Sequence, residues 1–463
     1  MKFVILNGSP KGAESVTMQY ILYIKKKHPE HEYNIMNIAQ TIKKIENDDN
    51  RFENIIQQIK ESDGVIWGFP LYVMLVCSQY KRFIELVFEK NAEVAFENKY
   101  TIVISTSIHF YDHTAQNYMQ SICDDLKMKY VGNFPADSWD LLYPKRRARW
   151  LLFAEEFINH IENNFPTSKH FTPLIRREFR YTPSKIIDDS KKINTNCKNI
   201  LVVSDETSEN TNLGNMLKRF KDSFSSEIEI ININDIDIKG GCLSCLQCGY
   251  DHKCSYIGKD GFIDFWEGIV MASDILIFAG VIKDRYLSAK WKMALDRAFY
   301  MTHTPTLIGK QMGYIISGPL SQIPNLTEMF QGHIELQGSN LVDIITDEFG
   351  TSEEIDALLH DFARRLVTFS NTDYIKPLTF LGEGGRKIFR DDIYGRNRFV
   401  FMADHEYYEK HGLYDTFPQN DERAKKLNEK LIPLIKIDKI RNKMNMKQEF
   451  LRPFRKVLED PIK

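Results

Sequence analysis

Residues 2–10 read KFVILNGSP, a short apolar run that stops at a turn containing glycine. The run has the length of a buried strand, and residues 17–27 after the turn have helical character. Two more apolar runs, at 64–67 and 100–104, also end at loop residues, with helix-like segments between them. Continuous apolar strands that alternate with helices are typical of an α/β fold, a doubly wound parallel sheet covered by helices.

The pattern repeats in the second half of the chain. Residues 61–67, ESDGVIW, match residues 272–278, ASDILIF, at an offset of 211. The same offset relates Tyr80 to Trp291, Lys81 to Lys292, and Lys99 to Lys310. The first strands, 3–6 and 200–203, match at an offset of 197, so the second half contains a net insertion of 14 residues. Four of the seven cysteines lie in the interval that contains it.

This repeat predicts two tandem domains followed by a tail. We expect a first domain over residues 1–163, a connector over 164–199, and a second domain with the cysteine insert over 200–372. A loop and a charged helical tail are expected over 373–463. Gly382 to Gly385 neither follow a strand nor open a helix, so we interpret them as part of that loop.

The turn after the first strand is suited to a phosphate monoester. Gly8 and Gly12 permit close approach of the backbone, and the hydroxyl groups of Ser9, Ser15 and Thr17 can donate hydrogen bonds. The following helix presents free N–H groups and the positive end of its dipole. The turn has neither a Walker A nor a Gly-x-Gly-x-x-Gly sequence, which disfavours ATP hydrolysis and dinucleotide binding there. The alternative is a plain turn in which Ser15 or Thr17 caps the helix.

A second loop, residues 69–72, follows the strand at 64–67. In a doubly wound sheet it lies beside the first turn, at the switch point where such sheets bind ligands. A backbone fixed by Pro70 can lie against a flat ring, and Tyr72 can stack on the ring or donate to it. The alternative is a hydrophobic turn that covers the sheet.

These motifs together resemble those of the NAD(P)H-dependent FMN reductases and iron–sulfur flavoproteins, whose fold is flavodoxin-like. The resemblance covers most of residues 1–130 and includes Ser78-x-x-Lys81-x-Phe83-Ile84. It implies that the FMN phosphate is held by Gly8, Ser9, Pro10, Lys11, Ser15 and Thr17. It implies that the flavin ring contacts Pro70, Leu71, Tyr72 and Val73, and that Ser107, His109 and Tyr111 close its other side. Tyr72 and His109 are then contacts of the flavin face, and no catalytic side chain is expected.

The insert carries the spacing C-x2-C-x2-C-x5-C, formed by Cys242, Cys245, Cys248 and Cys254. Structural zinc sites generally use two cysteine pairs separated by a longer stretch, so a compact set of four favours a cubane cluster. In the related ferredoxin run the fourth cysteine precedes proline and serves another cluster, whereas here Ser255 follows. The motif resembles that of the iron–sulfur flavoproteins and implies a [4Fe–4S] cluster. Zinc, or thiols without a metal, is the alternative.

The flavin motifs are weaker in the second half. Residues 204–211, SDETSENT, contain three carboxylates and no glycine, which opposes a dianionic phosphate. At the offset of 211, Val281 replaces Pro70 and Lys283 replaces Tyr72. Asn210, Thr211 and Tyr286 would still permit a flavin site, but we expect a degenerate one. We therefore predict one flavin domain and one cluster domain.

Composition excludes several classes of partner. The 463 residues contain 61 Lys and Arg against 63 Asp and Glu, so no overall attraction to nucleic acid or to an anionic membrane is expected. The basic run at 145–149 is interpreted as a solvated helix start. Without a long apolar stretch or a signal-like start, the protein is expected to be soluble and cytoplasmic.

The expected function is that of an FMN-dependent oxidoreductase or electron-transfer protein. Its electrons would come from NAD(P)H, by the resemblance, or from a reduced carrier, and would pass between FMN and the cluster. One alternative is a simple NAD(P)H-dependent FMN, quinone or nitro reductase with structural zinc, and another is a non-catalytic module. A small molecule or protein serves as donor or acceptor. The chain could form a homodimer or a pseudo-dimer within itself.

Overall fold

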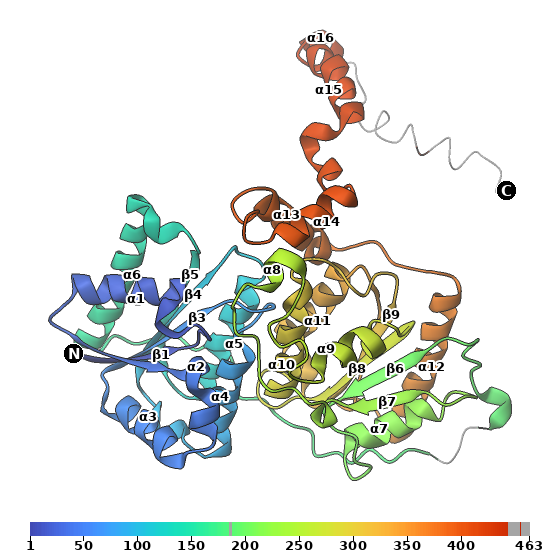
Figure 1. Cartoon of the computed structure of the whole chain (residues 1–463), viewed down its shortest axis with the longest axis horizontal. Helices are drawn as coiled ribbons and strands as arrows, with labels where there is room; N and C mark the ends of the chain where they lie inside the picture. The colour runs from blue at the N-terminus through green and yellow to red at the C-terminus, as the bar shows by residue number, and fades with distance from the viewer. Residues whose placement is uncertain (185–187, 443–453, 455–463) are drawn as a thin grey trace. The chain divides into compact units, whose positions relative to one another are not determined.

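Each half of the chain forms a five-stranded parallel sheet in the computed structural model, which describes residues 1–184, 188–442 and 454 (Figure 1). The first sheet has the order β2-β1-β3-β4-β5 and the second the order β7-β6-β8-β9-β10. The strands of the first sheet are β1 (Lys2–Asn7), β2 (Glu32–Asn37), β3 (Gly64–Pro70), β4 (Tyr100–Ser107) and β5 (Lys129–Asp137). Those of the second are β6 (Ile200–Ser204), β7 (Glu229–Asn232), β8 (Ile275–Val281), β9 (Gln311–Ser317) and β10 (Asn340–Thr346). The predicted doubly wound fold, present twice, is confirmed.

Helices cover both faces of the first sheet because its strands are apolar on both faces. The helices are α1 (Val16–Lys27), α2 (Ile38–Glu46), α3 (Asp49–Glu61), α4 (Ser78–Glu89), α5 (Asp112–Asp125) and α6 (Pro144–Glu162). Phe3 and Ile5 of β1 pack with α1 and α6, whereas Val4 and Leu6 pack with the remaining helices. The alternation along a strand thus assigns neighbouring residues to opposite layers. The basic run at 145–149 lies in the first turns of α6, as predicted.

The second domain repeats this arrangement. Its helices are α7 (Asn212–Lys221), α8 (Cys248–Asp251), α9 (Phe262–Phe265), α10 (Ala289–Ala298), α11 (Pro324–Leu336) and α12 (Ser352–Asn371). The predicted correspondence extends to single hydrogen bonds: the Lys99 ammonium donates to the carbonyl groups of residues 60 and 62, and the Lys310 ammonium to those of 271 and 273. The two domains also share one hydrophobic core cluster, so they are packed together rather than tethered.

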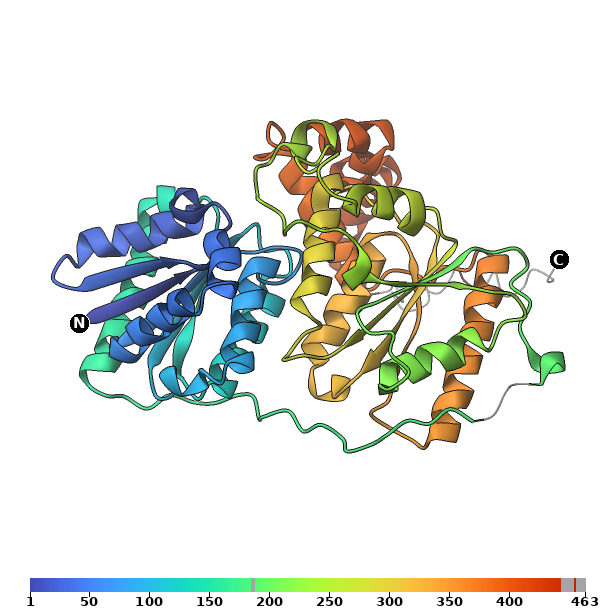
Figure 2. The ribbon, with the colours of Figure 1, turned by 60° about the horizontal axis from the view of Figure 1, so that its bottom comes forward.

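The segment expected to connect the domains is largely extended between α6 and β6 (Figure 2). Residues 185–187 of this connector lie outside the described residues. The domain boundaries at 163, 199 and 372 remain predictions.

The prediction of a loop at Gly382 to Gly385 is wrong, because these residues lie in a helix, α13 (Phe380–Tyr394). A Cβ atom on Gly382 would lie 2.8 Å from the carboxylate of Glu335, and one on Gly385 would lie 2.7 Å from Leu336. Both contacts are with α11, so these glycines allow two helices to approach closely. Their role is tertiary packing, which local glycine content does not reveal.

Of the described residues, those up to His405 form one compact unit and those from Glu406 onward a second. Helix α14 (Met402–Lys410) crosses this boundary, and the second unit contains α15 (Glu422–Ile435) and α16 (Asp438–Arg441). The predicted helical tail is therefore present up to residue 442; its remainder, except for residue 454, lies outside the described residues. In the described part of the chain, every helix is too short or too polar to cross a membrane.

Candidate functional site

Backbone hydrogen bonds fix the first two predicted loops at the carboxyl edge of the first sheet. The amide of Gly8 donates to the carbonyl of Gly68 in β3 at 2.7 Å, and the amide of Leu71 donates to that of Thr106 in β4 at 3.0 Å. The hydroxyl groups of Thr17 and Thr106 are 2.6 Å apart. The turn after β1 and the loop after β3 are therefore neighbours, at the position where doubly wound sheets bind ligands.

The turn after β1 carries the kinds of donor that a phosphate cradle uses. Ser15 caps α1 by accepting from the amide of Met18 at 3.2 Å, as the capping alternative predicted. Ser9 is buried, and its hydroxyl oxygen accepts from the amide of Lys11 at 3.3 Å. Gly12 has a φ of +60°, and Pro10 and Lys11 are half-buried. Two hydroxyl groups, one ammonium group and the free N–H groups of a 12-residue helix suit a dianion.

Thr17 lies differently from the other predicted phosphate residues. Its side chain is fully buried, and its hydroxyl group pairs with Thr106 rather than opening toward the turn. In this arrangement Thr17 links α1 to β4 beneath the cradle.

The loop after β3 forms a tight turn that exposes one edge. The amide of Tyr72 donates to the carbonyl of Leu75 at 2.7 Å, and the amide of Leu75 donates back at 2.9 Å. Val73 and Met74 between them have φ values of +38° and +65°, a conformation that costs energy for residues with side chains. Pro70, Leu71 and Val73 are half-buried, so their edge of the loop is available to a planar ligand.

Tyr72 points toward the second domain. Its side chain is buried, and burial raises its pKa well above the usual value. The thiol of Cys242 is close enough to add to that shift. The flavin loop predicted in the first domain thus contacts the cysteine insert of the second.

The third predicted loop holds His109 at its surface. The amide of His109 donates to the hydroxyl group of Ser107 at 2.9 Å, and its ring nitrogen Nδ1 lies 2.8 Å from the carboxylate of Asp112. That hydrogen bond raises the pKa of His109. Tyr111 is buried and packs against α11, since a Cβ atom on Gly332 would lie 2.3 Å from its hydroxyl oxygen. His109 is therefore available to a ligand, whereas Tyr111 belongs to the interface between the domains.

An open cavity of about 580 Å³ adjoins this third loop. It is lined by charged and polar side chains: His109, Asp137, Asp140, Arg146, Arg149 and Arg396. Arg396 binds the carboxylate of Asp137 through two hydrogen bonds of 2.9 Å, and Arg146 binds Asp140 at 2.7 Å. Arg149 is the third guanidinium group of the lining, and the carboxylates of Asp112, Asp137 and Asp140 all favour the protonated form of His109.

The cysteine insert follows β7, as predicted, and begins against the first domain. The side-chain amide of Gln79 donates to the carbonyl of Cys242 at 2.9 Å. Cys245 is exposed, whereas Cys242, Cys248 and Cys254 are partly buried. Burial, with the neighbouring thiols adding to it, raises the pKa of Cys242 and of Cys248 to about 12.

The four sulfur atoms are not arranged as a zinc tetrahedron. Among the described residues, no three of these sulfur atoms all lie within 4.8 Å of one another. Zn–S bonds of about 2.3 Å at tetrahedral angles would place the sulfurs roughly 3.8 Å apart.

Arg297 of α10 holds both ends of the insert together. Its guanidinium group binds Asp260 with hydrogen bonds of 2.7 and 3.0 Å and the carbonyl of Gly240 at 3.1 Å. It also stacks on the ring of Tyr256 at 3.9 Å. Both charged side chains are inaccessible to solvent. Because Gly240 precedes Cys242 and Asp260 follows Cys254, one buried arginine closes the loop that presents all four thiols.

A buried carboxylate fixes the middle of the insert. Asp404 accepts from His252, which lies between Cys248 and Cys254, at 3.0 Å and from His303 at 2.8 Å. These hydrogen bonds hold the pKa of Asp404 well below its usual value although the group is buried. Asp404 lies in α14, so the insert is attached to α14 as well as to α10.

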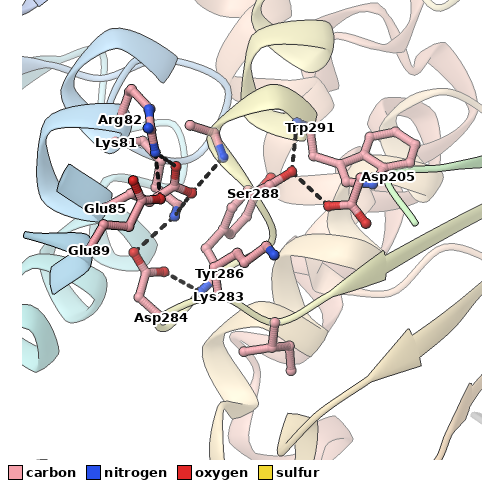
Figure 3. A network of polar contacts seen from close by, with 12 residues as sticks. Lys81, Arg82, Glu85, Glu89, Asp205, Lys283, Asp284, Tyr286, Ser288 and Trp291 are labelled. Carbon is pink, nitrogen blue, oxygen red and sulfur yellow. Dashed lines mark hydrogen bonds and ion pairs between the residues drawn. The ribbon is translucent and has the colours of Figure 1, made fainter. Parts of the chain in front are cut away.

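In the loop after β6, the carboxylates of Asp205 and Glu206 accept hydrogen bonds from nearby protein groups. Asp205 accepts from the amide of Val281 at 3.2 Å and from the hydroxyl group of Ser288 at 2.7 Å (Figure 3). Glu206 accepts from the amide of Ser208 at 2.7 Å. Carboxylates thus occupy donors of the kind that a phosphate would use, and the degenerate flavin site stays a prediction.

Sequence reasoning missed several residues that shape this site. Arg396 reaches Asp137 from 259 positions away, and Asp404 reaches His252 from 152. No local sequence pattern predicts these pairs, because only tertiary packing brings the two partners together.

Comparison with known proteins identifies the fold of the first domain. Residues 1–156 match a family described as having a flavodoxin-like fold. Similar solved structures include an NADPH-quinone reductase from P. pentosaceus (16% identity, 34% of this chain and 96% of that chain, TM-score 0.27). Others are an FMN-dependent NADH-azoreductase from Bacillus anthracis in complex with FMN (14%, 35% and 98%, 0.27) and a flavoenzyme NAD(P)H:(acceptor) oxidoreductase from Paracoccus denitrificans (16%, 35% and 97%, 0.29). Comparison with curated protein sequences gave no match.

Proposed function

Starting from a first domain of flavodoxin-like fold, we propose that this protein is an FMN-dependent oxidoreductase with a [4Fe–4S] cluster on the same chain. It would exchange electrons between NAD(P)H, or a reduced carrier, and an acceptor. One observation carries the proposal: the loop predicted to contact the flavin and the segment that bears the cysteines lie against each other, where Tyr72 is buried near Cys242 and Gln79 donates to the carbonyl of Cys242 at 2.9 Å. Two redox groups held at these places would be close enough for electron transfer within one chain.

The residues of the first domain fit FMN. Ser9, Ser15 and Lys11 would bind its phosphate at the amino end of α1, and the half-buried edge at Pro70 would lie along the ring. When bound, FMN supplies hydride acceptance and single-electron transfer. The protein needs to hold the ring, exclude water from one side of it, and offer a proton or hydrogen bond from His109.

The cavity beside His109 supports a nicotinamide donor. The phosphates of NAD(P)H are anionic, and Arg146, Arg149 and Arg396 contribute positive charge where a donor would approach the ring. A volume of about 580 Å³ suits a ligand of moderate size that binds in the open and leaves again. Arg149 lines the cavity and, within the described residues, lacks an ion pair, so it can bind a phosphate without breaking one.

The insert fits an iron–sulfur cluster by the chemistry of its donors. Four thiols on a loop closed by Arg297 provide the ligands that such clusters use. Because the pKa of Cys242 is raised, the thiols give up their protons when a metal binds, and cluster binding is coupled to proton release.

Anaerobic purification followed by a visible spectrum, flavin extraction, and iron and zinc assays tests the proposal. One FMN and about four irons per chain are expected, the content of one [4Fe–4S] cluster. Cys245→Ala should remove the iron and leave the flavin. FMN with zinc would favour the simple reductase, and a colourless protein would exclude both enzymatic alternatives.

A further inference from the structure

Helices α4 and α10 cap each other across the boundary between the two domains. The amide of Ser78, the first residue of α4, donates to the carboxylate of Asp296 at 2.7 Å. The amide of Ala289, the first residue of α10, donates to the carboxylate of Glu85, also at 2.7 Å. Ser78 corresponds to Ala289, and Glu85 to Asp296, at the offset of 211. Reciprocal contacts between equivalent residues define an isologous interface, such as two copies of one subunit form.

Two buried lysines continue this relation. Lys81 and Lys292 correspond to each other, and both are fully buried. Each forms an ion pair with the acid one turn later on its own helix, Glu85 and Asp296 respectively. The pseudo-two-fold relation thus includes charged groups that are costly to bury and are retained in both halves.

The two lysines differ in the loop that they hold. Lys292 of the second domain donates to the backbone carbonyl of Tyr72, at the start of the tight turn in the first domain, at 3.0 Å. Lys81 of the first domain donates to the side-chain carboxylate of Asp284 at 2.9 Å (Figure 3). Asp284 lies in the corresponding turn, where the amide of Lys283 donates to the carbonyl of Tyr286. Lys292 therefore fixes the backbone of the first domain's turn, whereas Lys81 forms an ion pair with a side chain of the second domain's turn.

We propose that Lys292 and Asp296 are positioning residues for the flavin loop at 70–75, so that the second domain acts as the built-in partner of the first. This inference rests on the proposed function. Lys292 fixes the carbonyl of Tyr72, and Asp296 fixes the start of α4 immediately after the loop. The corresponding half of the interface, built around Lys81 and Glu85, is retained without a second flavin site, since Asp205 and Asp284 occupy the turns of the second domain. The chain then binds one flavin and needs no second copy of itself.

Two double variants at corresponding positions test the proposal. Lys292→Met/Asp296→Asn removes the buried lysine and its helix partner from one half, and Lys81→Met/Glu85→Gln removes the equivalent pair from the other, where Asp284 remains. Both new amides can still accept from the helix amides. Amide hydrogen exchange of Leu71, Tyr72 and Leu75 in the flavin-free protein reports the order of the loop, and quenching of flavin fluorescence gives the dissociation constant of FMN.

We expect the first variant to speed exchange in the loop at least tenfold and to weaken FMN binding at least tenfold. Lys81→Met/Glu85→Gln should change the loop exchange and the FMN dissociation constant less than threefold. It should instead speed exchange at residues 283–286. Equal effects of the two variants, or an unchanged loop in the first, would overturn the inference. If the wild-type chain binds no FMN, the proposed function fails, while the exchange data still decide the positioning. If the first variant does not fold, Lys292→Arg, which keeps the charge but moves the donor, should speed loop exchange at least threefold, and no change would overturn the inference.

Discussion

Removing the guanidinium group of Arg297 should release the cysteine insert. In Arg297→Gln the buried carboxylate of Asp260 loses its ion partner, and the carbonyl of Gly240 loses its donor. Breaking a buried pair from one side costs about 3–5 kcal/mol. Because Arg297 joins the two ends of one loop, we expect most of this cost to fall on the insert and not on the sheet. At about 1.4 kcal/mol per factor of ten, the population of the open insert rises roughly 100- to 4,000-fold.

Hydrogen exchange of residues 238–262 in the metal-free protein measures this opening, and an iron assay measures its consequence. Arg219→Gln is the matched control, since Arg219 pairs with the buried carboxylate of Asp356 on the other side of the second sheet. Both variants should lower the free energy of unfolding, but only Arg297→Gln should lose iron. The reasoning is refuted if exchange in the insert rises less than threefold, or if the control loses iron equally.

Three further perturbations address other parts of the site. Ser9→Ala should weaken FMN binding about 10- to 100-fold, the value of a hydrogen bond to a charged group, and an unchanged dissociation constant in fluorescence titration would contradict the cradle. Asp112→Asn should lower the pKa of His109 toward its usual value of about 6.5, as followed by NMR. Because the pKa is raised in the folded state, this pair stabilises the protein at low pH and ceases to do so above the raised pKa; a variant equally destabilised at pH 9 would exclude that explanation. In calorimetry, Gly385→Ala should lower the free energy of unfolding by about 1–3 kcal/mol, since its Cβ would meet Leu336 at 2.7 Å. The control Gly384→Ala has its nearest neighbour at 3.5 Å and should raise the free energy of unfolding by about 1 kcal/mol through helix propensity. Shifts of the same sign in both glycine variants would contradict the close packing of α13.

The proposed arrangement also explains why the second domain keeps a flavodoxin-like core without a phosphate cradle. Its sheet and α10 are needed to cap α4, to hold the Tyr72 carbonyl and to anchor the insert through Arg297. None of these tasks requires the loop after β6 to bind a ligand. Asp205 in that loop can therefore accept a hydrogen bond from Ser288, the residue that caps α10.

The sequence alone determined the elements and their order. Buried strands, helix caps such as Ser15 and the repeat at an offset of 211 follow from local hydrogen bonding and hydrophobic periodicity, which neighbouring residues largely decide. The chemistry of the turn after β1 and of the four cysteines was also recognisable, because it lies within short segments.

Tertiary structure alone decided how these segments meet. The hydrogen bond from Gln79 to Cys242, the bond from Lys292 to Tyr72 and the approach of Arg396 to Asp137 join residues more than 160 positions apart. The glycines of α13 likewise follow from the surface of α11. Such contacts depend on how two sheets with their helices pack, and the free energy of that packing is distributed over a shared core that no single motif encodes.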